Sequence, residues 1–112
     1  MKIVTKKITL KEIEEMAKNM FGNVVKAVID IDKKIMVVDG ELHADEEAIL
    51  IKNGSEQKNL WGVNIYPAEK ENFIEFDSMI NIRPSAGNKS RTVESESIKK
   101  IIVGIVENLI LR

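Results

Sequence analysis

The chain has 112 residues, of which 44% are hydrophobic and 31% charged, and its formal net charge is −1. This length fits one globular domain, residues 1–112, and the balanced charge is atypical of proteins that wrap nucleic acid. The absence of cysteine excludes disulfides, thiolate nucleophiles and cysteine-bound metal centres. No segment approaches the roughly 20 apolar residues of a membrane span, and the start lacks the apolar run of a signal peptide. We therefore expect a cytoplasmic protein that does not contact a membrane.

A first helix is predicted from about Leu10 to Phe21. Thr9 and Glu12 match a capping box, in which each side chain satisfies a backbone N–H at the start of the helix. The apolar residues that follow have helical spacing and form one stripe: Ile13, Met16, Ala17, Met20 and Phe21. Gly22 predicts the stop, because glycine readily adopts the left-handed conformation that ends helices.

From Lys26 the apolar spacing changes to every second residue, which is typical of a strand. We predict a hairpin with a tight turn at residues 32–34. The side chains that face the core would be Ala27, Ile29, Ile31, Met36 and Val38. The opposite face would carry Asp30, Asp39 and, if the strand extends so far, Glu41.

Residues 41–54 allow two interpretations. Asp45, Glu46 and Glu47 suit the first turn of a helix, whereas residues 48–51 form an unbroken apolar run that is typical of a buried strand. We favour a short helix that ends at Asn53 and Gly54.

A second hairpin is predicted from Leu60–Tyr66 and Phe73–Arg83, which are separated by Pro67 and a polar loop. Its apolar face would consist of Trp61, Val63, Ile65, Ile74, Phe76, Ile80 and Ile82. Its polar face would consist of Asn64, Tyr66, Glu75, Asp77, Asn81 and Arg83. Pro84 ends the second strand, because proline offers no donor to the ladder.

The last helix begins near Ser95, a good cap residue, and its apolar stripe has the strongest periodicity in the chain. Gly104 lies inside this helix, and we take it to indicate close packing against another element. Together these elements predict an α+β fold. We expect a two-layer sandwich, in which a mainly antiparallel sheet of four or five strands is packed by the N-terminal and C-terminal amphipathic helices. The polar face of the sheet would then be open to solvent, a ligand or a second copy.

One candidate site lies on that polar face. The alternation of Asp39, Glu41, His43 and Asp45 would place four side chains on one side of a strand, where they could bind a metal or perform acid–base catalysis. A helical conformation of this segment would break the alignment. Polar residues also face water on any one-sided sheet, and a lone histidine is more often structural than catalytic.

A second candidate site is the loop from Arg83 to Arg91, which combines guanidinium donors, hydroxyls, glycine and a nearby helix start. The residues expected to hold an anion are Arg83, Asn88, Ser90 and Arg91, and those expected to line its approach are Asp77, Asn81 and Tyr66. The loop matches neither a Walker nor a Rossmann motif. In the alternative interpretation, an arginine pairs with Asp77, Glu94 or another carboxylate and fixes the loop.

Several segments resemble an uncharacterised prokaryotic family of small proteins, domain of unknown function 5674. These are GELHAD (residues 40–45), NGS (53–55), LWGVNIYP (60–67), FIEFDS (73–78), NIRP (81–84) and GNKSR (87–91). The resemblance spans almost the whole chain and implies a small, self-contained prokaryotic protein. It implies no activity, cofactor or catalytic residue.

The leading functional hypothesis is a small binding or regulatory module that self-associates, as a homodimer for example. Its partner would be an anionic small molecule or a nucleic-acid phosphate bound at the Arg83 to Arg91 loop. The rival hypothesis is a hydrolase-like enzyme, in which His43 with Asp39, Glu41 or Asp45 binds a metal or transfers protons. A third is a purely structural interaction protein. The sequence indicates no particular cofactor.

Overall fold

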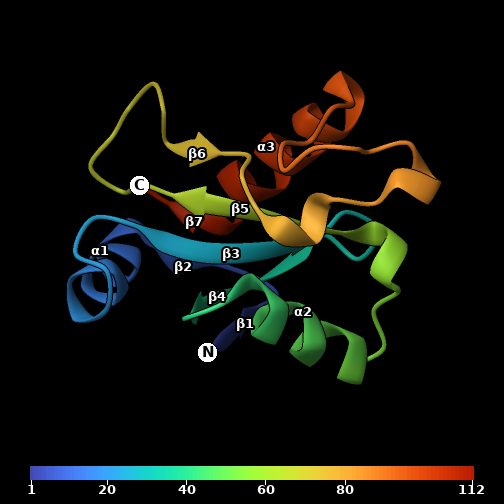
Figure 1. The fold of residues 1–112 in the computed structure, drawn as a ribbon. Coiled ribbons are helices and arrows are strands. Elements are labelled where there is room, and N and C mark those ends of the chain that lie inside the picture. The colour runs from blue at the N-terminus through green and yellow to red at the C-terminus, as the bar shows by residue number, and fades with distance from the viewer.

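A five-stranded antiparallel sheet forms the centre of the computed structural model, which describes residues 1–112 (Figure 1). Its strand order is β1-β4-β3-β5-β6, and the strands are β1 (Lys2–Val4), β4 (Ile35–Gly40), β3 (Val25–Asp30), β5 (Leu60–Ile65) and β6 (Ile74–Glu75). The helices are α1 (Leu10–Asn19), α2 (His43–Lys52) and α3 (Glu96–Leu109). Two short strands, β2 (Ile8–Thr9) and β7 (Ile110–Leu111), pair in parallel and join the two ends of the chain. The sequence pattern did not predict this pair.

The predicted first hairpin is confirmed as β3 and β4, with Ala27 opposite Val38. Lys34 adopts a positive φ of 59° in the turn, and its N–H donates to the carbonyl of Asp30 at 2.9 Å. β3 also pairs with β5, so it is the central strand of the sheet. Alternate side chains of these strands therefore point to opposite faces.

The first face of the sheet carries the main core, which α1 and α3 cover. A cluster of 19 buried residues joins this face to the two helices. The helix starts are confirmed: Thr9 and Glu12 form the capping box, and the hydroxyl of Ser95 accepts a hydrogen bond from the N–H of Ile98. Local capping groups and an apolar stripe thus suffice to define both helices.

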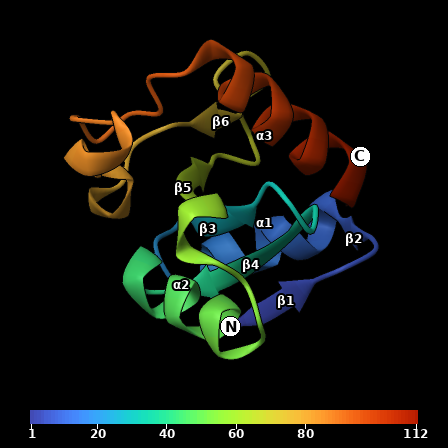
Figure 2. The ribbon, with the colours of Figure 1, turned by 90° about the vertical axis from the view of Figure 1, so that its right-hand side faces the viewer.

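The second face is covered in part by α2, on the side of the sheet opposite to α3 (Figure 2). A smaller cluster of four buried residues lies between them: Val28, Val37, Leu50 and Leu60. The helical interpretation of residues 41–54 is confirmed, as is the α+β class with helices packed on an antiparallel sheet. α2 packs over β3 and β4, so the second face is less open than the sequence predicts. No helix has the length and apolar character that crossing a membrane requires.

The second hairpin is shorter than predicted, because the extended pairing of residues 73–83 ends after Glu75. Asn81 supplies the reason: its Oδ1 accepts from the N–H of Gly62 at 2.8 Å, and its Nδ2 donates to the carbonyl of Gly62 at 3.0 Å. One amide side chain thus replaces a backbone partner on this edge of β5. The predicted alternation is consequently wrong beyond Phe76, and Ile80 packs on the second face instead of the first.

The predictions made for two glycines, a helix stop at Gly22 and close packing at Gly104, have different outcomes. Gly22 has a positive φ of 97°, as expected for a stop signal, although α1 itself ends at Asn19. The prediction of close packing at Gly104 is wrong, because an added Cβ would meet nothing within 4 Å.

Candidate functional site

Arg83 is the first residue of the predicted anion loop, and its side chain lies against the protein with only 13% of its area exposed. Its guanidinium stacks on the ring of Trp61 at 4.9 Å, and Nη2 lies 3.5 Å from a carboxylate oxygen of Glu47. Nη2 also donates to the carbonyl of Leu60. Arg83 thus connects the loop to α2 and β5, as the alternative interpretation expects of an arginine that fixes the loop.

Asn88 and Asn81 are buried, with exposed fractions of 5% and 0%. Nδ2 of Asn88 donates to three backbone carbonyls, those of Asn81 (2.8 Å), Ser90 (3.1 Å) and Thr92 (2.8 Å). Oδ1 of Asn88 accepts from the N–H of Glu94 at 2.9 Å. The hydrogen-bonding capacity of both amides is therefore directed into the chain, where it shapes the loop.

The loop does bind a carboxylate, and that carboxylate belongs to Glu94. Oε2 of Glu94 accepts hydrogen bonds from the N–H of Lys89 at 2.7 Å, the N–H of Ser90 at 2.8 Å and the hydroxyl of Ser90 at 2.9 Å. These bonds lower the pKa of Glu94. The backbone and hydroxyl donors of Lys89 and Ser90 are thus already occupied.

Arg91, the last residue of the loop, points elsewhere. Its Nε donates to Oδ1 of Asp77 at 2.6 Å, and this pair is about half exposed. Arg83 and Arg91 therefore engage different carboxylates, and the structure does not bring the two guanidinium groups together.

Arg91 and Asp77 line a pocket of about 220 Å³ between the start of α2 and the segment that follows β6. We call this the α2 pocket; its lining residues are Lys26, Leu42, His43, Ala44, Asn64, Asp77, Ser78, Met79, Ile80 and Arg91. The pocket unites three sequence candidates, His43, Asp77 and Arg91, from three separate segments. Lys26 was not among the candidates from the sequence. The alternation along the strand nevertheless places its side chain on the face of the sheet that Ala27, which faces the core, does not use.

His43 is the first residue of α2 and is 91% buried, with an exposed fraction of 9%. Its Nε2 lies 2.7 Å from the carbonyl oxygen of Val63. Because a carbonyl only accepts, Nε2 must carry the proton, and Nδ1 of the neutral ring is left as an acceptor. Burial lowers the pKa of His43, and the positive charges of Lys26 and Arg91 act in the same direction.

The rim of the α2 pocket combines basic side chains with apolar surface. The cap position of α2 is Leu42, and no side chain caps this helix. The positive end of the helix therefore lies beside Lys26 and Arg91, and the exposed Asp45 in the first turn offsets part of it. Leu42 and Met79 line the same pocket and are 55% and 64% exposed.

The other candidates for catalysis or metal binding lie apart from one another. Asp39 is in β4 with a positive φ of 68°, Glu41 is exposed in the turn, and Asp45 is exposed in the first turn of α2. The helix breaks the strand alignment on which their grouping depended. No three histidine, aspartate or glutamate side chains come close enough to hold a metal ion.

Glu46 is a buried carboxyl group that the sequence did not single out. Its exposed fraction is 0%, Oε2 accepts from the N–H of Gly40 at 3.0 Å, and Oε1 has no partner. Burial raises the pKa of Glu46 to about 9, so the group is neutral at physiological pH. His43, Glu46 and Leu50 lie on one face of α2, but two polar residues of the three hide this buried face from the sequence pattern.

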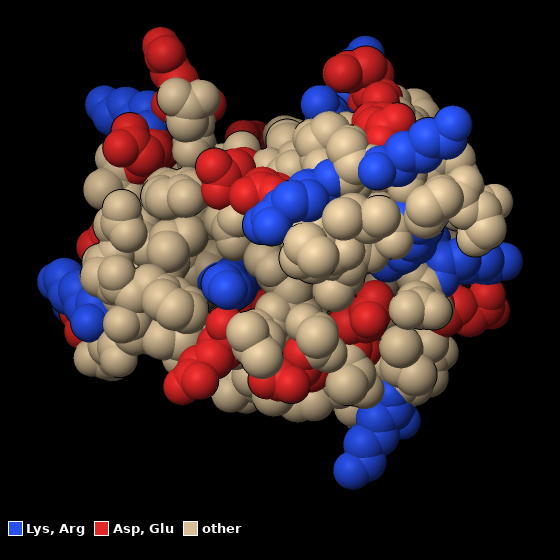
Figure 3. All heavy atoms as spheres, viewed as in Figure 1, with Lys and Arg blue, Asp and Glu red and all other residues tan.

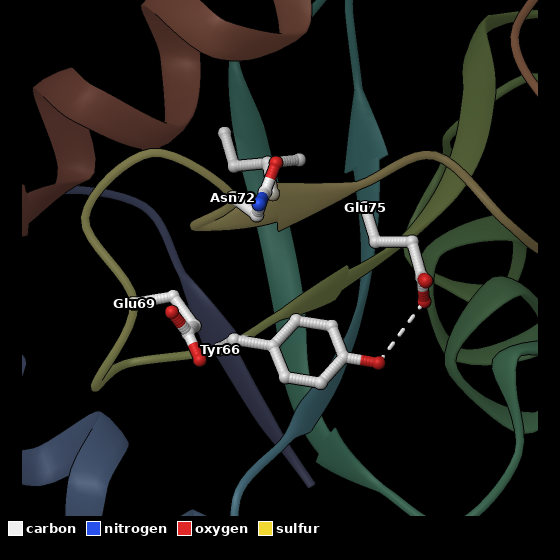
Figure 4. A pocket seen from close by; sticks show the side chains of 5 residues that line it. Tyr66, Glu69, Asn72 and Glu75 are labelled. Carbon is white, nitrogen blue, oxygen red and sulfur yellow. Dashed lines mark hydrogen bonds between the residues drawn. The ribbon is translucent and has the colours of Figure 1, made fainter.

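The largest hollow, about 460 Å³, lies beside the β5–β6 connection and contains Tyr66 (Figure 4). The hydroxyl of Tyr66 donates to Oε1 of Glu75 at 3.1 Å, and Asn64 donates to the same oxygen at 2.9 Å. Glu69 and Glu75 line this hollow without any cation. It therefore offers no positive charge to an anion, and Tyr66 faces it instead of the α2 pocket.

Acidic and basic side chains alternate over the surface viewed in Figure 3, and neither sign forms a broad patch. This face thus lacks the continuous basic area that nucleic-acid backbones require. The basic residues of the α2 pocket are Lys26 and Arg91 alone.

The fold defines a small α+β protein in which three helices pack on an antiparallel sheet. The model of a family described as "Protein of unknown function (DUF5674)" matches residues 2–109, so the chain belongs to this family, as its sequence motifs predicted. No curated protein and no solved structure matches the chain.

Proposed function

We propose that the protein is a small binding module that holds an anionic ligand in the α2 pocket. The observation that carries this proposal is the charge balance of the lining. Lys26 and Arg91 contribute two positive charges against the single negative charge of Asp77, and His43 is neutral. The uncapped start of α2 adds its partial positive charge to the same place.

The anion enters between Leu42 and Met79, whose exposed side chains provide apolar contacts on its flanks. The ligand class is therefore a small molecule or side chain with an anionic head group. The pocket volume of about 220 Å³ fits a head group and excludes a bulky polymer. Arg83, Asn81 and Asn88 support the pocket from within the protein and do not touch the ligand.

The test is calorimetric titration with inorganic phosphate at constant ionic strength. The double variant Lys26→Gln/Arg91→Gln should lose binding, whereas Lys11→Gln, an exposed lysine on α1, should bind as the wild type does. Asp77→Asn removes the only negative charge from the lining and should strengthen binding several-fold. Unchanged binding by the double variant would refute the proposal, as would weaker binding by Asp77→Asn in a folded protein.

One observation favours the rival function, acid–base catalysis. The Nε2 bond to Val63 leaves Nδ1 of His43 unprotonated, and His43 lines a pocket that also contains a carboxylate, Asp77. If the protein hydrolyses a phosphate ester, p-nitrophenyl phosphate should be turned over by the wild type and not by His43→Gln. Absence of turnover, with binding retained, supports the binding module alone.

A further inference from the structure

The α2 pocket contains hydrogen-bond acceptors as well as cations, and both carboxylate oxygens of Asp77 already accept from Arg91. Lys26 and Arg91 can only donate hydrogen bonds, while Nδ1 of His43 can only accept one. The bond from Nε2 of His43 to the carbonyl of Val63, at 2.7 Å, fixes this arrangement, because it requires the proton to be on Nε2.

The ring of His43 makes one hydrogen bond within the chain, through Nε2, so Nδ1 has no partner there. Nδ1 is also not one of the fully buried polar atoms without a partner, so solvent reaches it. Since His43 is 91% buried and lines the α2 pocket, the pocket is the place from which Nδ1 is reached. A ligand that fills the pocket must either donate to Nδ1 or leave a desolvated acceptor unpaired, which is unfavourable.

We propose that the α2 pocket selects oxyanions that carry a hydroxyl group, such as monohydrogen phosphate, over oxyanions without one, such as sulfate. The negative oxygens of phosphate face Lys26, Arg91 and the start of α2, and its P–OH donates to Nδ1 of His43. Sulfate and simple carboxylates carry no proton at neutral pH, so they would place a lone pair against that of Nδ1. This inference rests on the proposed anion site and names the chemical class of its ligand.

The lowered pKa of His43 supports this arrangement, because a protonated ring would donate from both nitrogens and favour sulfate as much as phosphate. The charged groups that act on the ring are Lys26 and Arg91, which disfavour protonation, and Asp77, which favours it. Burial is the largest of these effects.

The experiment compares inorganic phosphate with sulfate at mildly alkaline pH, where both are dianions of similar size. Wild-type protein should bind phosphate about tenfold more tightly, which is the effect expected of one net hydrogen bond. His43→Gln keeps an N–H for the Val63 carbonyl but has no acceptor at the Nδ1 position, so the preference should disappear. His43→Asn restores an acceptor oxygen near that position and should retain part of the preference.

The ring ¹⁵N spectrum of His43, the only histidine, provides a second measurement on the unmodified protein. Nε2 should be the protonated nitrogen, and phosphate should shift the Nδ1 resonance while sulfate does not. Equal affinity for the two anions, or a proton on Nδ1, would overturn this inference and leave the anion site intact. Binding of neither anion would overturn the proposed function itself.

Discussion

Glu94 fills an anion site that its own loop forms with Ser90: one carboxylate oxygen accepts hydrogen bonds from both the N–H and the hydroxyl of that serine, at 2.8 and 2.9 Å. The sequence pattern of the loop therefore indicates the right chemistry but the wrong partner. An internal carboxylate satisfies donors that would otherwise need a ligand or water.

Replacement of Glu94 by glutamine should loosen this loop without affecting phosphate binding in the α2 pocket. The amide accepts less strongly than the carboxylate, so the N–H groups of Lys89 and Ser90 should exchange faster with solvent hydrogen. Because the pKa of Glu94 is lowered in the folded state, the ionised carboxylate contributes to the stability of the protein at pH values above the ordinary pKa of 4.5. It is lost as the pH falls through the lower folded-state pKa. Amide exchange measured by NMR tests this, and unchanged exchange at both residues would contradict it.

Replacement of Glu46 by glutamine should stabilise the protein at about pH 8, by roughly 1–3 kcal/mol. The pKa of Glu46 is raised from 4.5 to about 9, so wild-type folding consumes a proton in this range. Its favourable contribution is complete below pH 4.5 and is lost as the pH rises towards about 9. Glutamine mimics the neutral acid and removes this dependence.

Urea unfolding of the two proteins at about pH 5 and about pH 8 measures this effect. The difference in free energy of unfolding between Glu46→Gln and the wild type should be small at about pH 5 and larger at about pH 8. Glu41→Gln, at an exposed position two residues before α2, serves as the control and should show neither change. Lower stability of Glu46→Gln at the higher pH would show that the carboxyl group is ionised in the folded protein.

Arg83→Met should destabilise the protein by about 2 kcal/mol, because it leaves the carboxylate of Glu47 largely buried without its cation. Trp61 is the only tryptophan, so its fluorescence should report the loss of the stacked guanidinium directly. Phosphate binding by the folded variant should be unchanged. A loss of binding with stability preserved would instead assign Arg83 to the ligand site.

Asn81→Ala should be among the most destabilising single substitutions, at roughly 2–4 kcal/mol. It removes both hydrogen bonds to the backbone of Gly62 and a third, of 3.0 Å, to the carbonyl of Arg91. Thermal unfolding measures the effect. If Asn81→Ala melts within a few degrees of the wild type, the amide does not replace a strand partner as described.

Local patterns predicted the helices and the first hairpin well. The capping side chains of Thr9 and Ser95 act within four residues, and the alternation from Ala27 to Val38 depends only on strand geometry. The irregular segment after Glu75 could not be predicted in this way, because Asn81 meets Gly62 across 19 residues of sequence. Nothing local distinguishes such an asparagine from one that faces solvent.

The candidate site was predicted in part. His43, Asp77 and Arg91 were all identified by residue type, but they were assigned to two different sites. These three residues come together only because α2 packs on the second face of the sheet. The apolar contacts that position α2 there form only a small cluster. Polar residues at buried helix positions, such as His43 and Glu46, give no amphipathic signal, so sequence periodicity could not place this helix.

The position of bound phosphate is the most direct test of the central claim, and an NMR titration of the ¹⁵N-labelled wild-type protein determines it. Saturable shifts should centre on the amides of Lys26, His43 and Ala44, with smaller changes around Asp77. Shifts centred on residues 88–90, or a linear response spread over the exposed lysines, would contradict an anion site at the start of α2.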